Sequence, residues 1–307
     1  MNGEIPIVAV VGATAAGKTG LSLDLAERLG GEVVNTDAMQ LYRRMDIGTA
    51  KLAVGERRGI PHHLLDVLDV TEPASVAEYQ GLARATIADL RGRGRTPVLV
   101  GGSALYTRAV LDRFEFPGTD PAVRARLERE LARHGVQALV ERLREVDPVS
   151  AGRIEAATPG NGRRIVRALE VVEITGEPFS ARLPVQEYVD RHSIQIGVDI
   201  DRETLDARIQ QRVEEMFEAG FVEEVERLLD VGLAGSRTAA TAIGYREVAQ
   251  HLSGVLTLAE AKGRTAVKTR QFARRQDAWF RKDPRVVWVA YDDPHRVEKA
   301  IDAIREV

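Results

Sequence analysis

A glycine-rich motif near the N-terminus constrains the fold of this chain more than any other feature. Residues 12–19, Gly-Ala-Thr-Ala-Ala-Gly-Lys-Thr, match the pattern G-x-x-x-x-G-K-[ST]. The apolar run 5–11 precedes the motif, and leucines at helical spacing follow it between 21 and 29. A buried strand, a phosphate loop and a helix in this order are typical of a P-loop protein. The motif therefore predicts a parallel sheet with a phosphate site beyond its edge.

The rest of the chain alternates between short apolar runs and helical patterns. We expect further strands at 33–34, 97–100, 193–200 and 286–290. Helices are expected at 74–91, 202–219, 221–230, 240–252 and 257–282. Residues 119–192 are helical, arginine-rich and without a clear strand. The predicted fold class is α/β, with a P-loop NTPase-like parallel sheet core at 1–118 and 193–307, a helical insertion at 119–192 and a helical C-terminal part.

Composition excludes several classes of protein. The 307 residues include no cysteine, so disulfides, thiolate nucleophiles and cysteine-bound zinc are excluded. The formal net charge is −3, so any contact with nucleic acid depends on local basic patches. No apolar run approaches the roughly 18–20 residues of a membrane span, and the N-terminal run lacks the basic residues of a signal peptide. We expect a cytoplasmic monomer with no membrane segment.

The phosphate loop predicts an anion site but does not identify which anion binds there. Its backbone N–H groups can hold phosphate oxygens, Lys18 adds positive charge, and the Thr19 hydroxyl can bind Mg²⁺. The strand 97–100 ends in two glycines, where an ordinary NTPase has an aspartate for Mg²⁺, although Asp199 or Asp201 could serve instead. The anion is therefore ATP, GTP or a diphosphate leaving group. The residues of this site are Gly12, Ala13, Thr14, Ala15, Ala16, Gly17, Lys18 and Thr19.

Asp37 follows the second predicted strand. Ligands of open α/β sheets bind beyond the carboxyl ends of the strands, so Asp37 and Lys18 are expected to face one crevice. Asp37 is a candidate general base, or a hydrogen-bond acceptor for a reacting amine. Its position is equally consistent with an Asx turn or a helix N-cap before residues 39–42.

Several motifs together make the chain resemble the tRNA dimethylallyltransferases, also called tRNA isopentenyltransferases. The resemblance covers nearly the whole sequence, and the motifs occur in the order and spacing of that family. Beyond the phosphate loop, the motifs lie at 37–42, 46–51, 61–66, 101–106, 164–170, 242–246, 269–276 and 279–281. The sequence departs from the usual family residues at Ala13, Ala38, Ser103 and Gly162.

The resemblance implies an activity. It implies that a dimethylallyl group moves from dimethylallyl diphosphate to N6 of the adenosine immediately 3′ of the anticodon in tRNA, with Mg²⁺. The phosphate loop would then hold diphosphate, with Arg212 as a second cation, and Lys18, Asp37 and Ser103 would be catalytic. The implied contacts to the tRNA anticodon stem-loop are Asp37, Ala38, Met39, Gln40, Ser103, Arg163, Arg164, Ile165, Val166 and Arg167.

Two basic patches agree with an RNA substrate. Residues 262–282 hold eight Lys or Arg against one acid, and Arg270 and Arg274 are one helical turn apart. Arg164 and Arg167 share a helix face in the insertion in the same way. We expect phosphate contacts from Arg270, Arg274 and Arg275, and a further contact from Arg124. The alternative for each of these arginines, and for Arg212, is a solvated helix face.

The remaining conspicuous residues receive structural interpretations. The pair His62-His63 lacks a third metal ligand and is interpreted as structural or pocket-lining. Trp279 and Trp288 are expected in the core. Three rival functions stay open: a prenyltransferase for free adenine nucleotides, a P-loop kinase for a small molecule, and a non-catalytic RNA-binding protein with a nucleotide switch.

Overall fold

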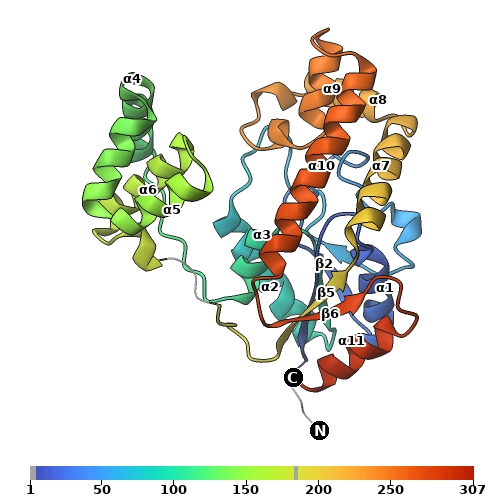
Figure 1. Cartoon of the computed structure of the whole chain (residues 1–307). Coiled ribbons are helices and arrows are strands. Elements are labelled where there is room, and N and C mark those ends of the chain that lie inside the picture. The colour runs from blue at the N-terminus through green and yellow to red at the C-terminus, as the bar shows by residue number, and fades with distance from the viewer. Residues whose placement is uncertain (1–4, 183–185) are drawn as a thin grey trace. The chain divides into compact units, whose positions relative to one another are not determined.

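The computed structural model describes residues 5–182 and 186–307 (Figure 1). The chain divides into two compact units: one contains Met1–Leu111 and Tyr188–Val307, and the other contains Asp112–Glu187. The helical insertion thus exists as a unit of its own, with both boundaries earlier than the predicted 119–192. Residues 188–192 belong to the first unit because they are tied to its strands and helices. The Val189 N–H donates to the Leu111 carbonyl, and the Ile7 N–H donates to the His192 carbonyl, both at 2.8 Å.

The first unit is built on one parallel sheet of six strands, in the order β3-β2-β4-β1-β5-β6. The predicted strands are present, and a short edge strand of two histidines adds to them. The strands are β1 Ile7–Val11, β2 Glu32–Asn35, β3 His62–His63, β4 Pro97–Val100, β5 Ser193–Asp199 and β6 Val286–Ala290. Because β1 lies at the centre with β4 and β5 beside it, the loop after β1 sits in the middle of the carboxyl edge.

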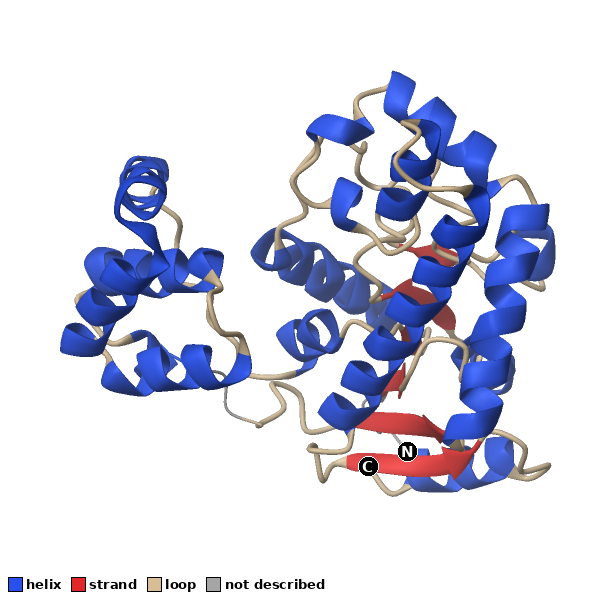
Figure 2. Cartoon of the chain, turned by 45° about the horizontal axis from the view of Figure 1, so that its top comes forward, coloured by secondary structure: helices blue, strands red, loops and turns tan. Residues whose placement is uncertain are grey.

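Helices cover both faces of the sheet (Figure 2). On one face, Val8 and Val10 of β1 pack in a cluster with α1 (Lys18–Leu29) and α11 (Arg296–Arg305). On the other face, Ile7 and Ala9 pack with α2 (Val76–Gly92) and α3 (Ala104–Leu111). Burial on both faces explains why the central strands β1 and β4 are continuous apolar runs.

The C-terminal helices form a cap beyond the carboxyl edge of the sheet. They are α7 Arg202–Glu218, α8 Phe221–Asp230, α9 Tyr245–Leu252 and α10 Leu258–Phe280. The helix predicted at 240–252 begins only at Tyr245, because Gly244 adopts a φ of +90° and a short 3-10 turn precedes it. Helix α10 joins the cap to the sheet, with Ala266 in the cap cluster and Ala273 and Phe280 in the clusters on the two sheet faces.

The described residues of the second unit form α4 Pro121–Val146, which is interrupted at Gly135, followed by α5 Pro148–Ala157 and α6 Gly162–Thr175. Leu127 and Leu143 of α4 pack against Ile165 and Leu169 of α6 in its own core. Asp120 and Asp147 cap the first two helices through their carboxylates. Among the residues that the structure describes, no helix is long and apolar enough to cross a membrane.

Candidate active site

The phosphate loop connects β1 to α1, as its motif predicts. Gly17 has a φ of +104°, a conformation that strongly favours glycine, and α1 begins at the next residue. The Lys18 ammonium folds back over the loop and donates to the Ala13 carbonyl at 2.6 Å. Thr19 lies exposed in the first turn of α1. The loop therefore places a helix N-terminus and a lysine together, which is the arrangement of an anion site.

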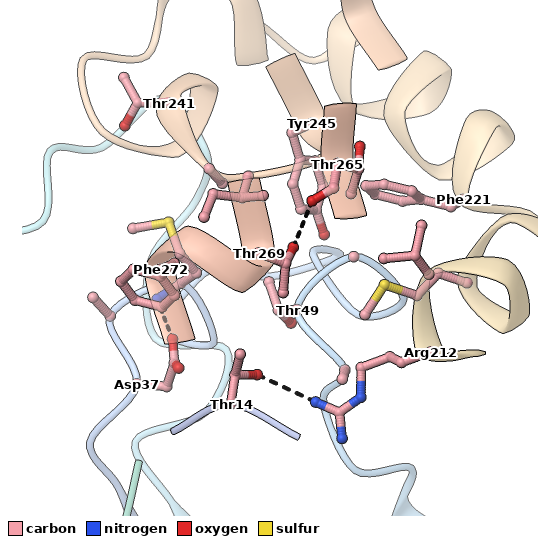
Figure 3. A pocket seen from close by; sticks show the side chains of 18 of the residues that line it. Thr14, Asp37, Thr49, Arg212, Phe221, Thr241, Tyr245, Thr265, Thr269 and Phe272 are labelled. Carbon is pink, nitrogen blue, oxygen red and sulfur yellow. Dashed lines mark hydrogen bonds between the residues drawn. The ribbon is translucent and has the colours of Figure 1, made fainter. Parts of the chain in front are cut away.

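The segment after β2 holds Asp37 in a fixed conformation. The Asn35 side chain accepts from the Asp37 N–H at 2.8 Å and donates to the Asp37 carbonyl at 3.0 Å. The Asp37 carboxylate accepts from the Met39 N–H at 2.9 Å, which is an Asx turn. The same carboxylate lines a cavity (Figure 3). The two interpretations of this residue are therefore compatible, because one oxygen can hold the turn while the carboxyl group faces a ligand.

The two positions after β4 require glycine, because other groups occupy the space that a side chain would need. A Cβ on Gly101 would lie 2.3 Å from the Thr36 hydroxyl and 2.8 Å from the Asp37 nitrogen. A Cβ on Gly102 would lie 2.1 Å from the Gln276 side chain. The next residue, Ser103, accepts a hydrogen bond from the Ala38 N–H at 3.2 Å. The strand thus ends in a close approach to the Asp37 loop rather than in a metal-binding aspartate.

A cavity of about 410 Å³ lies between these loops and the helical cap. Thr14, Asp37, Ser103 and Arg212 line its polar side, and Arg212 donates to the Thr14 hydroxyl at 3.3 Å. Figure 3 shows Thr14, Asp37 and Arg212 along one side and the rings of Phe221 and Tyr245 across from them. The other apolar lining residues include Val213, Met216, Ala242, Ile243 and Phe272. The structure therefore joins the predicted base, phosphate loop and second cation in one space with an apolar side.

Electrostatics tune the two central ionisable groups in opposite directions. Burial lowers the pKa of the Lys18 ammonium to about 8, while nearby Asp37 opposes this shift and Arg212 adds to it. Burial raises the pKa of the Asp37 carboxyl above its ordinary value, against the N–H donors of Met39 and Gln40 and the charge of Lys18. A carboxylate with a raised pKa is a stronger base than an exposed one. The pair suits proton abstraction beside a negatively charged ligand.

Glu224 organises the apolar side of the cavity, although nothing in its local sequence indicates such a role. Its buried carboxylate accepts from the N–H groups of Asp46, Ile47 and Gly48 at 3.0, 2.8 and 3.2 Å. It also accepts from the Tyr245 hydroxyl at 2.6 Å. In the sequence Glu224 is one acid among several in an amphipathic helix. Only the fold reveals that three consecutive amides converge on it.

The predicted RNA contacts on α10 separate into two groups. Arg270 donates to Gln210 at 2.6 Å, and Arg274 pairs with Asp206 at 3.5 Å. These two arginines do share a face, as predicted, but that face is directed toward α7. Arg275 is exposed and lines the cavity. Arg275 is therefore the arginine of this group that is placed to meet a substrate.

The second unit holds six of the predicted RNA contacts, and five of them, residues 163–167, lie on α6. Arg163 and Arg164 are exposed at the start of α6. Ile165 and Val166 are only 1% and 2% exposed, and their side chains pack in the core of the unit rather than on its surface. Arg167 donates at 2.7 Å to the buried Glu170.

Arg124, the additional predicted contact in this unit, also serves the buried carboxylate of Glu170. Its Nε donates to that carboxylate at 3.0 Å, and a second guanidinium nitrogen pairs with the same oxygen. Arg124 and Arg167 thus neutralise one buried acid from two sides. Both arginines therefore have a structural role, which is to pair with a carboxylate that would otherwise be buried without a counter-charge.

The structure also shows the surroundings of the two histidines and the two tryptophans. His63 bonds to the buried Glu32 at 2.6 Å and His62 to the Ile60 carbonyl at 2.8 Å, so both are structural, as predicted. Trp288 packs partly buried against the sheet. The expectation of a core position for Trp279 is wrong, because its side chain is 41% exposed with the Arg108 guanidinium 5.3 Å from its ring.

The chain is similar in sequence to known transferases. A family model described as IPP transferase matches residues 40–283. A curated tRNA dimethylallyltransferase from Nocardioides sp. is 72% identical over 97% of this chain and 96% of that protein. One from Streptomyces griseus is 55% identical over 97% of this chain and 97% of that protein.

Solved structures agree in fold over nearly the whole chain. A tRNA isopentenylpyrophosphate transferase from Bacillus halodurans gives a TM-score of 0.70 at 39% identity and covers 98% of this chain and 95% of that one. A eukaryotic dimethylallyltransferase described as acting on tRNA gives a TM-score of 0.81 at 25% identity and covers 97% of this chain and 77% of that one. The fold class and the family resemblance predicted from the sequence are confirmed.

Proposed function

Since this chain belongs to the IPP transferase family, we propose that it transfers a dimethylallyl group from dimethylallyl diphosphate to N6 of the adenosine immediately 3′ of the anticodon in tRNA. Its curated relatives are named as transferases, which confirms the predicted enzyme class. The observation that carries the proposal is the shared cavity. A carboxylate with a raised pKa, a phosphate loop and an apolar side meet there, as attack of an amine on an allylic diphosphate requires.

The charged groups around the phosphate loop have distinct roles in this reaction. Adenine N6 is a weak nucleophile because its lone pair is delocalised into the ring. As N6 bonds to the first carbon of the dimethylallyl group, the bond from that carbon to the diphosphate oxygen breaks. The Asp37 carboxylate accepts the proton that N6 loses. The loop amides, Lys18 and Arg212 stabilise the charge that collects on the departing diphosphate.

The predicted Mg²⁺ fits the donor set at this site. Among residues 5–182 and 186–307, no three carboxylate or imidazole side chains gather as a metal cage. A P-loop cation does not need such a cage, because phosphate oxygens and water supply most of its ligands. The exposed hydroxyl of Thr19 is the protein ligand we assign to it. The cation would supply additional charge neutralisation for the diphosphate.

The acceptor must leave the anticodon-loop stack to reach Asp37. Enzymes that act on a base generally extrude it, and single-stranded loops suit this because their bases are already partly unstacked. Phe272 and Arg275 line the cavity from α10, and Met39 lines it beside Asp37. We assign these residues to the extruded base and its phosphate, and the exposed Arg163 and Arg164 of the second unit to the RNA backbone.

Replacing Arg275 with alanine tests the RNA surface. We expect Kd for tRNA to rise several-fold and the slope of log Kd against log salt to decrease by about 1, as for one lost phosphate contact. Filter binding at several salt concentrations measures both. Arg305→Ala is the control, because Arg305 is an exposed arginine of α11 that pairs with Asp302. An unchanged salt slope for Arg275→Ala would remove this residue from the RNA contacts.

The pH dependence of transfer follows from the two shifted groups. Asp37 must be ionised, so activity rises with pH through its raised pKa. Lys18 must be protonated, so kcat/KM for the donor falls as pH rises through about 8. Bound diphosphate favours the charged lysine, so the alkaline limb of kcat should lie at higher pH than that of kcat/KM. Initial rates from pH 5 to 10 measure both limbs, and coincident alkaline limbs would contradict this assignment of Lys18.

One assay separates the proposed function from its rivals. Purified protein and Mg²⁺ are mixed with radiolabelled dimethylallyl diphosphate and offered unmodified tRNA, AMP or ADP as acceptor. Label in tRNA supports the proposal. Label in the free nucleotide alone would indicate a nucleotide prenyltransferase, and consumption of ATP with a small acceptor and no prenyl transfer would indicate a kinase. Tight tRNA binding without product would indicate a non-catalytic RNA-binding protein.

A further inference from the structure

One buried side chain connects the two halves of the cavity. Gln276 lies on α10 with only 4% of its surface exposed. Its Oε1 accepts from the Thr14 N–H of the phosphate loop at 2.8 Å. Its Nε2 donates to the Gly102 carbonyl at 2.8 Å. The orientation of the amide is unambiguous, because a flipped amide would place a donor against an N–H and an acceptor against a carbonyl.

Each end of this bridge is connected, through one further hydrogen bond, to the surroundings of a group that we assign to the reaction. On the donor side, the Thr14 hydroxyl accepts from Arg212, the proposed cation at the diphosphate. On the acceptor side, Gly102 precedes Ser103, whose hydroxyl accepts from the N–H of Ala38, the residue after Asp37. The sheet fixes the starts of the two loops, because β1 and β4 are paired as far as Val10 and Val100. The Gln276 amide supplies a direct link between them.

The packing around the amide indicates that this position is specific. A Cβ on Gly102 would lie 2.1 Å from Gln276 Nε2, so the loop carries no side chain where the amide enters. The neighbouring Arg275 and the preceding Phe272 line the cavity from the same helix. The helix that offers side chains to RNA thus also holds the loop that receives the diphosphate.

We propose that Gln276 is a positioning residue that sets the distance between the departing diphosphate and the base Asp37. This inference rests on the proposed function, because it concerns the geometry of the same transfer. A displacement of about 1 Å between reacting groups can cost on the order of 10²-fold in rate. Loss of the bridge therefore slows the chemical step more than it weakens the binding of either substrate.

Gln276→Met tests this directly, because methionine has a similar length and forms neither hydrogen bond. We expect its single-turnover rate, at saturating donor and tRNA, to fall by roughly 30–100-fold. The Kd values for donor and tRNA should each change by less than about threefold. Gln271→Met is the matched control, because Gln271 is exposed on the same helix and should keep the wild-type rate.

Gln276→Glu supplies a readout that a purely structural role would not give. A neutral carboxylic acid can donate to the Gly102 carbonyl and accept from the Thr14 N–H, whereas an ionised carboxylate cannot donate. The rate of Gln276→Glu relative to wild type should therefore increase as pH falls through the pKa of the introduced carboxyl. The relative rate of Gln276→Met should stay flat. Thermal melting at each pH confirms that the folded fractions match.

Three outcomes would overturn the inference. A rate within about threefold of wild type for folded Gln276→Met would do so, as would a flat pH ratio for folded Gln276→Glu. If Gln276→Met does not fold, the pH ratio of Gln276→Glu decides alone. Absence of any prenyl product from the wild-type enzyme would overturn the proposed function, and this inference with it. Product from the wild type together with undiminished variants would overturn the positioning role only.

Discussion

Replacing Asp37 with asparagine lowers kcat by about 10²–10⁴-fold, the range expected for loss of a general base. Asparagine keeps the size of the side chain, and its oxygen can still accept from the Met39 N–H, so the Asx turn survives. What it loses is the ability to take the proton from N6. Initial rates of label transfer to tRNA measure the effect, and the Kd of the donor should change little.

The control for this substitution is Asp302→Asn, on the exposed side of α11. It should leave transfer unchanged. A kcat for Asp37→Asn within about threefold of wild type would contradict general-base catalysis by this carboxylate. The result also separates an enzyme from a binding protein, since binding of tRNA does not require a proton acceptor.

Replacing Lys18 with methionine is expected to lower kcat by about 10²–10³-fold, because it removes a buried cation from the departing diphosphate. The substitution has a second consequence. The charge of Lys18 lowers the pKa of Asp37, so its loss should move the acid limb of the pH profile to higher pH. Measuring kcat across the acid range tests both effects in one series.

The control for Lys18 is Lys299→Met, because Lys299 pairs with Asp293 on the surface near α11. It should keep both the rate and the acid limb of the wild type. A Lys18→Met enzyme with reduced kcat but an unmoved acid limb would show that the two side chains do not interact as the structure indicates.

The sequence predicts the parts of the site that local spacing determines. The phosphate loop needs a strand before it, a helix after it and glycine at a positive φ, and all three are visible in residues 5–29. Asp37 was placed at the same crevice because the carboxyl ends of parallel strands share one edge. The two strand-end glycines were recognised as a motif, but their cause, a close approach to Thr36 and Gln276, needs coordinates.

Features that depend on distant contacts were not predictable. Gln276 meets Thr14 across 262 positions of sequence, and Glu224 meets Gly48 across 176. Neither residue differs locally from an ordinary helix residue. The facing of Arg270 and Arg274 toward α7 likewise depends on how two helices pack. Trp279 is expected in the core as an aromatic residue, and the structure places it at the surface.

The most direct test of the proposed prenyl transfer is the identity of the modified nucleoside. Two unmodified tRNA transcripts differ only by adenosine or guanosine immediately 3′ of the anticodon. Each is incubated with enzyme, Mg²⁺ and dimethylallyl diphosphate, digested to nucleosides and analysed by mass spectrometry. We expect one adenosine carrying a dimethylallyl group on N6 from the first transcript and none from the second. Equal modification of both transcripts, or a prenyl group on another atom, would contradict it.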